Sequence, residues 1–299
     1  MNGRDGFVAY VRTHYRPWTA LAYGAQVRRY VMWCGGEVAA RSADYGEVLR
    51  YLAELRAAGL AGRSVHAALG ALRAYYAWLT ATGVRADHPC RTLALADRVD
   101  RSIRTDVLPT PEQIARWVAG ATADRPGHRR RAAVACGLVG YQAATPGEVA
   151  ALRVGEVDLA AGTVRLGVPG ARTLARELPL RASQAVTLAR YLAEDRPRYV
   201  AEARARGHPA GDRLVLSRRG GPLLAQHVTR VVNGGRPAAE RLAPRLVRQG
   251  VIAGLLAAGH DVRIVQAFAG HRTAEATAAY GVAAAEALAA AIARGHPRR

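Results

Sequence analysis

Two side chains near the C-terminus have types and a spacing that could serve chemistry. Gly270-His271 is followed, nine residues after the histidine, by Tyr280, in the run Gly-His-Arg-Thr-Ala-Glu-Ala-Thr-Ala-Ala-Tyr. A tyrosine hydroxyl can act as a covalent nucleophile, but its pKa of about 10 requires a site that stabilises negative charge as attack proceeds. Arginine is the cation available for this, because the chain contains 43 arginines and no lysine.

The chain carries a large positive charge. Its 43 basic and 23 acidic residues give a net charge of +20 over 299 residues, which favours a polyanionic partner, nucleic acid before a membrane surface. No familiar aromatic-rich RNA-binding motif accompanies this charge, so RNA is kept only as a minor alternative among nucleic-acid partners.

Other composition features exclude several classes of protein. No apolar run reaches the ~18 residues of a membrane span, and the first five residues lack a signal-peptide core. Cys34, Cys90 and Cys136 form no C-x-x-C pair. We therefore expect neither a disulfide framework nor a metal site, and a cytoplasmic location without membrane association.

The elements that must position the His and Tyr begin with a helical N-terminal region. Apolar residues recur at helical spacing over 18–34 and 45–58, and Gly59 ends the second stretch. A third helix is expected after Gly62-Arg63, with Ser64 as its N-cap and Gly83 beyond its end. This pattern predicts four short helices in a compact bundle over residues 1–95.

A charged, aperiodic stretch at 96–108 is typical of a linker, and a second domain is expected over 109–299. It starts with Thr110-Pro111-Glu112-Gln113, where Thr110 and Gln113 can form a capping box around a first-turn proline. Helices are predicted near 111–120 and 128–142 and from Pro146, then short strands at 164–168 and 175–180. After a turn at 217–222, helices resume from about 225, ending in an Ala-rich helix at 284–293.

The order and spacing of several segments resemble the tyrosine recombinases of the phage-integrase family over nearly the whole chain. These segments are 59–79, 108–112, 212–223 and 255–266 leading to Gly270-His271. The resemblance implies a mainly α fold: an N-terminal SAM-like core-binding bundle, then an α+β catalytic domain with a small antiparallel sheet, together closing as a clamp on DNA. It also implies dimers and tetramers on DNA, with the helix after Tyr280 as a candidate for docking onto a neighbour.

The resemblance also implies a chemistry. In this family a tyrosine attacks a DNA phosphodiester, giving a 3′-phosphotyrosyl link and a free 5′-hydroxyl, with no metal and no nucleotide cofactor. By the family's pattern, Tyr280 falls on the nucleophile and Arg248 on the second phosphate-binding arginine. His271 falls on the position that hydrogen-bonds a phosphate oxygen.

Three positions depart from the family's pattern. Arg245 stands where the family usually has His, and arginine cannot exchange a proton near neutral pH. Thr145 stands at the first arginine, and Ala171 at the hairpin lysine that protonates the leaving oxygen, with Arg172 one residue on. Candidate replacement cations are Arg129, Arg130 and Arg131, on the helix before Thr145, and Arg245.

Two hypotheses remain open at this point. The chain is an atypical recombinase in which Tyr280 still breaks and rejoins DNA, or a cleavage-deficient accessory or regulatory DNA-binding protein on the same scaffold. Losing one preorganised donor typically costs about 10²–10³ in rate. The residues expected to contact DNA phosphates are Arg63, His66, Arg73, Arg172 and Arg176, and the expected place of action is the nucleoid.

Overall fold

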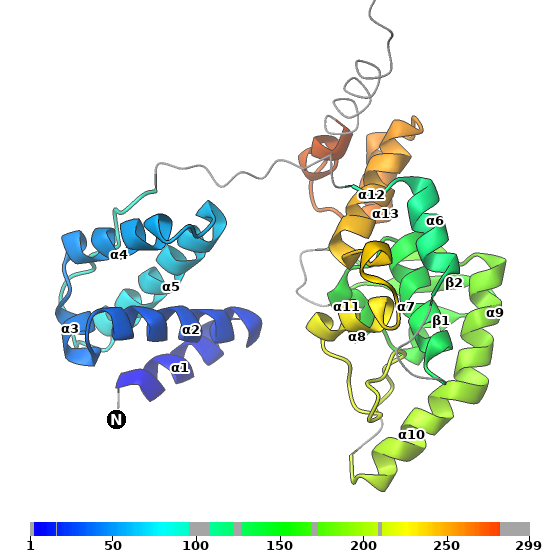
Figure 1. The fold of residues 1–299 in the computed structure, drawn as a ribbon, viewed down its shortest axis with the longest axis horizontal. Coiled ribbons are helices and arrows are strands. Elements are labelled where there is room, and N and C mark those ends of the chain that lie inside the picture. Colours follow the sequence, from blue (N-terminus) through cyan, green and yellow to red (C-terminus); the bar gives the residue numbers. More distant parts are fainter. Residues whose placement is uncertain are drawn as a thin grey trace, which may run out of the picture. The chain divides into compact units, whose positions relative to one another are not determined.

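Two compact units make up the computed structural model of the chain (Figure 1). The first comprises Met1–Arg101 and the second Ser102–Arg299, and each is described by itself. The structure describes residues 3–15, 17–95, 108–121, 127–168, 173–208 and 211–281. Ala171, Arg172, nearly all of the expected linker and the expected helix at 284–293 lie outside the described residues.

The N-terminal unit is a helical bundle with an aromatic core. Its described helices are α1 (Gly3–His14), α2 (Pro17–Trp33), α3 (Glu37–Ser42), α4 (Tyr45–Ala57) and α5 (Gly62–Ala81), one more than predicted. Tyr30 and Tyr76 are fully buried, and their hydroxyls lie 2.8 Å apart in a hydrogen bond. The Tyr76 hydroxyl also donates to the carbonyl of Ala40, so α2, α3 and α5 are joined through satisfied buried hydroxyls.

The prediction of an N-cap at Ser64 is wrong. α5 begins at Gly62 with Ala61 as its N-cap and without a side-chain cap. The Ser64 N–H already donates to the Ala61 carbonyl at 2.7 Å, which places Ser64 inside the first turn.

The C-terminal unit is mainly helical and carries one small sheet. α7 (Arg129–Tyr141) is almost entirely buried and packs against several other helices. The described helices around it are α6 (Pro111–Ala119), α8 (Pro146–Ala151), η2 (Val154–Glu156), α9 (Ala182–Arg190), η3 (Tyr191–Asp195), α10 (Arg196–Ala205), α11 (Ala225–Asn233), η4 (Ala238–Glu240), α12 (Pro244–Ala257) and α13 (Val262–Ala269).

The sheet is antiparallel in the order β1-β2-β3, formed by β1 (Val157–Asp158), β2 (Thr163–Leu166) and β3 (Arg176–Pro179). Val164 pairs with Leu178 and Leu166 with Arg176. Val164, Leu166 and Leu178 face the core, so the two-residue period fixes the face on which Arg176 lies. β3 thereby brings a buried guanidinium to the interior of the unit.

Helix starts in this unit follow local rules that the sequence displays. Thr110 caps α6 in a capping box with Gln113, and Pro111 occupies the first turn, as predicted. The long helical segment formed by α9, the π-helical turn η3 and α10 was not predicted. The predicted turn at 217–222 is present, closed by a 2.8 Å hydrogen bond from the Ser217 N–H to the Gly221 carbonyl.

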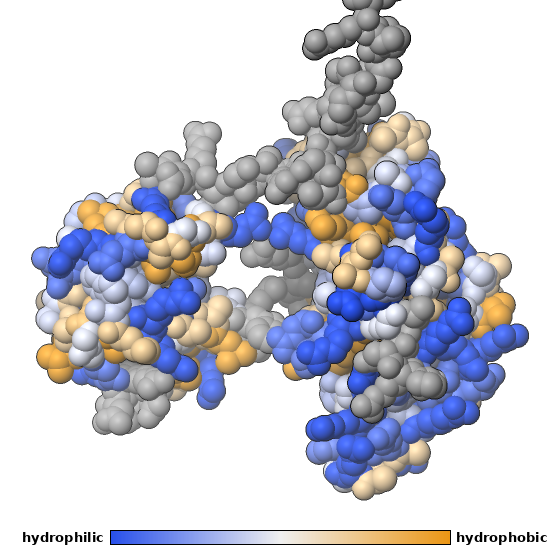
Figure 2. Space-filling model, viewed as in Figure 1, coloured by the Kyte–Doolittle hydropathy of each residue, from blue (hydrophilic) through white to orange (hydrophobic). Residues whose placement is uncertain are grey.

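Much of the visible surface of the C-terminal unit is hydrophilic (Figure 2). This surface is in keeping with a charge surplus carried by arginine. Within the described parts of the chain, no helix has both the length and the apolar character needed to cross a membrane.

Candidate active site

His271 and Tyr280 lie together in space. His271 follows α13 directly, and its ring stacks on that of Tyr280 with the centroids 5.8 Å apart and the planes 19° from parallel. Gly270 makes this turn possible: its φ is +68°, and a Cβ there would lie 2.8 Å from the Leu174 carbonyl oxygen and 2.9 Å from an Arg176 nitrogen. Only glycine fits both the backbone conformation and the close approach.

His271 is held as a neutral ring. Its Nδ1 lies 2.9 Å from the hydroxyl of Thr277, which is fully buried. Burial, together with the positive charges of Arg248 and Arg176, lowers the pKa of His271 to about 4. At neutral pH the imidazole is uncharged, and Nε2 is the ring nitrogen not bonded to Thr277.

Arg248 brings a buried guanidinium to the same place. It lies in α12, is only 8% exposed, and donates to the carbonyls of Ala143 and Ala269, the latter at 2.6 Å. Burial lowers its pKa, and the neighbouring charge of Arg176 acts in the same direction, while Glu148 and Tyr280 oppose this. A negative charge on the Tyr280 oxygen would therefore lie within electrostatic reach of Arg248.

One of the carbonyls that bind Arg248 belongs to a strained residue. Ala143 is fully buried and has a φ of +50°, in the left-handed region that residues with a Cβ rarely adopt. Such a conformation stores on the order of 1–3 kcal/mol and persists only where the surroundings enforce it. The Arg248 hydrogen bond is part of what enforces it here.

Thr145 serves a local structural purpose. It is the N-cap of α8: its Oγ1 accepts from the Glu148 N–H at 3.2 Å, and the Glu148 carboxylate accepts from the Thr145 N–H at 2.8 Å. This capping box satisfies two backbone donors at the start of the helix. The Thr-x-x-Glu pattern could have been recognised in the sequence, as it was for Thr110 and Gln113.

Glu148 and Arg176 form a buried ion pair beside Arg248. The Glu148 Oε1–Arg176 Nη1 distance is 2.6 Å, and the two side chains are 1% and 5% exposed. Burial acts to raise the pKa of Glu148, but the hydrogen bonds and charge of Arg176 outweigh it, so the pKa is lowered. The Thr173 hydroxyl also donates to Glu148, at 2.9 Å.

Three successive carbonyls at the end of α13 are held by different elements. Arg176 Nε donates to Phe268 at 2.6 Å, Arg248 Nη2 to Ala269, and the Leu174 N–H to Gly270 at 2.8 Å. The segment that ends in His271 is thus fixed to β3, to α12 and to the residues just before β3. Arg176 helps to hold this segment, and its predicted contact with a DNA phosphate stays a prediction.

Of the other predicted site residues in the described part of the C-terminal unit, Arg245 stays outside this cluster. Arg245 is exposed in the first turn of α12, and Arg63 is exposed at the start of α5, with His66 half-buried one turn on. Arg73 donates to the backbone carbonyls of Cys90 and Leu93, so it ties the end of its own unit together.

The arginines considered as replacements are also engaged elsewhere. Arg129 donates to the Ala121 carbonyl, Arg130 pairs with Glu194 and Asp195, and Arg131 donates to the Leu216 carbonyl. Among the described residues, Arg176 is the cation that accompanies Arg248 beside His271. No group of three His, Cys, Asp or Glu side chains in those residues could hold a metal ion.

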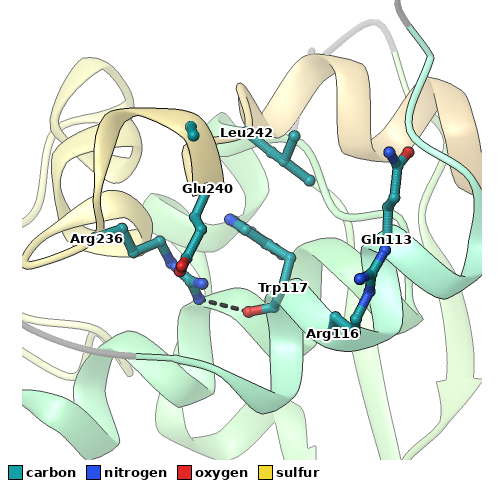
Figure 3. A pocket seen from close by; sticks show the side chains of 7 residues that line it. Gln113, Arg116, Trp117, Arg236, Glu240 and Leu242 are labelled. Atoms are coloured by element: carbon teal, nitrogen blue, oxygen red, sulfur yellow. Dashed lines mark hydrogen bonds between the residues drawn. The ribbon is translucent and has the colours of Figure 1, made fainter.

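A separate pocket of about 410 Å³ lies between α6 and the segment leading to α12 (Figure 3). Arg236 donates there to the Trp117 carbonyl, and Gln113, Arg116, Glu240 and Leu242 also line the pocket. It contains none of the predicted site residues. The predicted site residues Arg248, His271 and Tyr280 meet in the cluster described above, which is the candidate active site.

A helical bundle followed by a mixed domain that assembles an Arg-His-Tyr cluster defines the tyrosine recombinase class. The chain belongs to the phage integrase family: residues 111–286 match the model described as "Phage integrase family", and residues 5–83 match "Phage integrase, N-terminal SAM-like domain".

Individual relatives agree with this assignment. The chain is 30% identical over 257 residues to tyrosine recombinase XerC of Azotobacter vinelandii, covering 85% of this chain and 81% of that protein. It is 28% identical over 215 residues to tyrosine recombinase XerD of Neisseria meningitidis, covering 71% and 70%.

The fold is likewise that of solved integrases. The Tn1549 transposon integrase in complex with transposon right end DNA matches with a TM-score of 0.62 at 15% identity, covering 99% of both chains. A lambda integrase dimer bound to a COC′ core site matches with a TM-score of 0.62 at 15% identity, covering 93% of both.

Proposed function

We propose that this protein binds double-stranded DNA and cleaves and rejoins its strands through a 3′-phosphotyrosyl intermediate on Tyr280. The observation that carries the proposal is the assembly of Tyr280, neutral His271 and buried Arg248 in one preorganised cluster. Relatives named as recombinases, and fold neighbours solved on DNA, support the same function.

The cluster suits attack on a phosphodiester. The Tyr280 hydroxyl gives up its proton to water, and its oxygen forms a bond to phosphorus as the bond to the 5′-oxygen breaks, so negative charge grows on the non-bridging oxygens. Arg248 would stabilise that charge, and His271 would donate a hydrogen bond from Nε2 in the tautomer in which the Thr277 hydroxyl donates to Nδ1. Reversal by the 5′-hydroxyl of another strand rejoins the DNA and releases Tyr280.

The leaving oxygen has no lysine to protonate it, because the chain contains none. Arginine is a poor acid for this step, since its pKa lies above about 12. We infer that water supplies the proton and that cleavage is consequently slow. A leaving group that needs no proton should then react faster.

A suicide duplex, carrying a site that the protein is first shown to bind, tests the proposal. We expect a covalent protein–DNA adduct that is absent in Tyr280→Phe. A duplex with sulfur in place of the 5′-bridging oxygen should form the adduct faster, because a thiolate leaves without protonation. Absence of an adduct on both duplexes, with binding intact, would overturn strand cleavage.

A second candidate function is a cleavage-deficient DNA-binding accessory or regulatory protein. The use of Thr145 as a helix cap favours it, because this residue brings no charge to the phosphate. Bound DNA without an adduct on the sulfur-containing duplex is the result that this alternative predicts.

We further infer the organisation in which the protein acts. The proposed domains are a core-binding domain at 1–95, a linker at 96–108 and a catalytic domain at 109–299, working as dimers or tetramers on DNA. The dimer in the lambda integrase structure supports such an assembly. The proposed place of action is the nucleoid, where the DNA substrate lies.

A further inference from the structure

A strongly basic pocket lies in the C-terminal unit apart from the candidate active site. Its volume is about 390 Å³, and its walls come from the first turn of α7, the turn at 217–223 and α11. The polar residues lining it are Arg131, Ser217, Arg218, Arg219, His227 and Arg230. Within the described residues, no acidic side chain lines this pocket.

Arg131 is the buried cation of this pocket. It is 4% exposed, donates from Nη1 to the Leu216 carbonyl at 3.2 Å, and lies with its guanidinium carbon 5.4 Å from the centre of the Tyr199 ring. Its Nε is buried without a hydrogen-bond partner in the part of the chain that the structure describes. Burial lowers the pKa of Arg131, and the groups that oppose this are tyrosines rather than carboxylates.

The other buried arginines of this unit have more partners than Arg131, since Arg236 and Arg248 each donate from two nitrogens to two backbone carbonyls. Buried Arg176 is neutralised by Glu148, and neighbouring Arg130 pairs with Glu194 and Asp195. A buried charge without an opposite partner is unfavourable unless an anion neutralises it. Arg131 lacks such a partner among the described residues, and the exposed side chains of Arg219 and Arg230 add positive charge around it.

We propose that this pocket binds a phosphate group, either a backbone phosphate of DNA away from the point of cleavage or the phosphate of a free small ligand. Guanidinium groups bind phosphate oxygens in a bidentate manner, and Ser217 adds a hydroxyl donor. The DNA source rests on the proposed DNA binding but is independent of strand cleavage.

The test removes the exposed charges and keeps Arg131, whose contacts with Leu216 and Tyr199 also support the fold. The double variant Arg219→Gln/Arg230→Gln is compared with the control Arg116→Gln/Arg165→Gln, which removes the same charge from exposed positions on α6 and β2. Both full-length variants are assayed for duplex binding between about 50 and 200 mM salt.

Two measurements distinguish the sources of phosphate. If DNA is bound, the log–log salt slope of the pocket variant should fall by about 1–2 more than that of the control. In the second measurement, inorganic phosphate replaces chloride at equal ionic strength, and thermal unfolding is followed. Stabilisation lost only in the pocket variant, with an unchanged DNA slope, identifies a free phosphorylated ligand.

The proposal is overturned if the pocket variant matches the control in both measurements. Neither measurement requires Tyr280 to react. A failure of strand cleavage would therefore leave this test intact, and a failure here would leave the adduct assay intact.

Discussion

The buried Glu148–Arg176 pair should stabilise the C-terminal unit far more than an exposed pair does. Glu148→Gln keeps an oxygen that can accept from the Thr145 N–H but removes the negative charge beside Arg176. Arg176, with its side chain 5% exposed, would then be a buried cation without its counter-charge. Removing one partner of a buried pair costs about 3–5 kcal/mol.

A matched control is available in the same unit. Glu202 and Arg206 form an ion pair at 2.7 Å, with the side chains 44% and 45% exposed. Exposed pairs contribute about 0–1 kcal/mol, so Glu202→Gln should change stability little. The same chemical change is thereby compared at a buried and at an exposed pair.

Urea unfolding of the full-length variants measures the difference. We expect Glu148→Gln to lower the midpoint of the C-terminal unit's transition and to leave that of the N-terminal unit unmoved. Because the folded-state pKa of Glu148 is lowered, its contribution is present above the unfolded pKa of about 4.3 and is lost as pH falls through the folded value. A Glu148→Gln effect no larger than that of Glu202→Gln would refute the importance of the buried pair.

Three further predictions concern the chemistry of the cluster. Thr277→Val should slow adduct formation by roughly tenfold or more, because His271 loses the partner that fixes its tautomer. Thr277→Ser keeps the hydroxyl and should restore the rate of adduct formation. Equal rates in the two variants would contradict this role of Thr277. The folded-state pKa of His271, about 4, lies below its unfolded value, so its contribution to stability should be complete above about pH 6.5 and decline as pH falls toward 4. A urea series over that range, with His271→Gln as control, would contradict this if the two proteins showed the same pH dependence. Thr145→Arg should accelerate adduct formation by up to about 10²-fold, because it adds a phosphate-binding cation. The substitution should also lower the free energy of unfolding by about 1 kcal/mol through the lost helix cap, which urea unfolding measures. No acceleration in a folded variant would show that a guanidinium at position 145 cannot reach the phosphate.

Local patterns in the sequence predicted the local structure well. The capping box at Thr110 and the turn at 217–222 depend on neighbours in the chain, and both are present. The pairing of His271 with Tyr280 also belongs here, because a short connection between them keeps the two rings close. Such features need no knowledge of how distant elements pack.

The long-range contacts of the site could not be predicted from the sequence. Glu148 and Arg176 lie 28 residues apart on α8 and β3, and no periodicity indicates that they meet. Arg176 was predicted as a DNA phosphate contact, without its ion pair with Glu148, and the register of β3 turns it inward. Thr277, the hydrogen-bond partner of His271, was also missed. Its role depends on its being fully buried, which no pattern in the sequence indicates.

The charge of the assembled cluster explains why the departures from the family pattern matter. Among the described residues, Arg248 and Arg176 bring two positive charges, Glu148 removes one, and His271 is neutral, which leaves a single excess charge. A phosphodiester carries one negative charge before attack, but tyrosinate attack adds a second in the transition state. Catalysis requires stronger binding of the transition state than of the ground state. The described cluster therefore carries one positive charge too few for the transition state, which is a second reason to expect slow cleavage. An arginine at position 145 would supply the missing charge, but Thr145 there caps a helix.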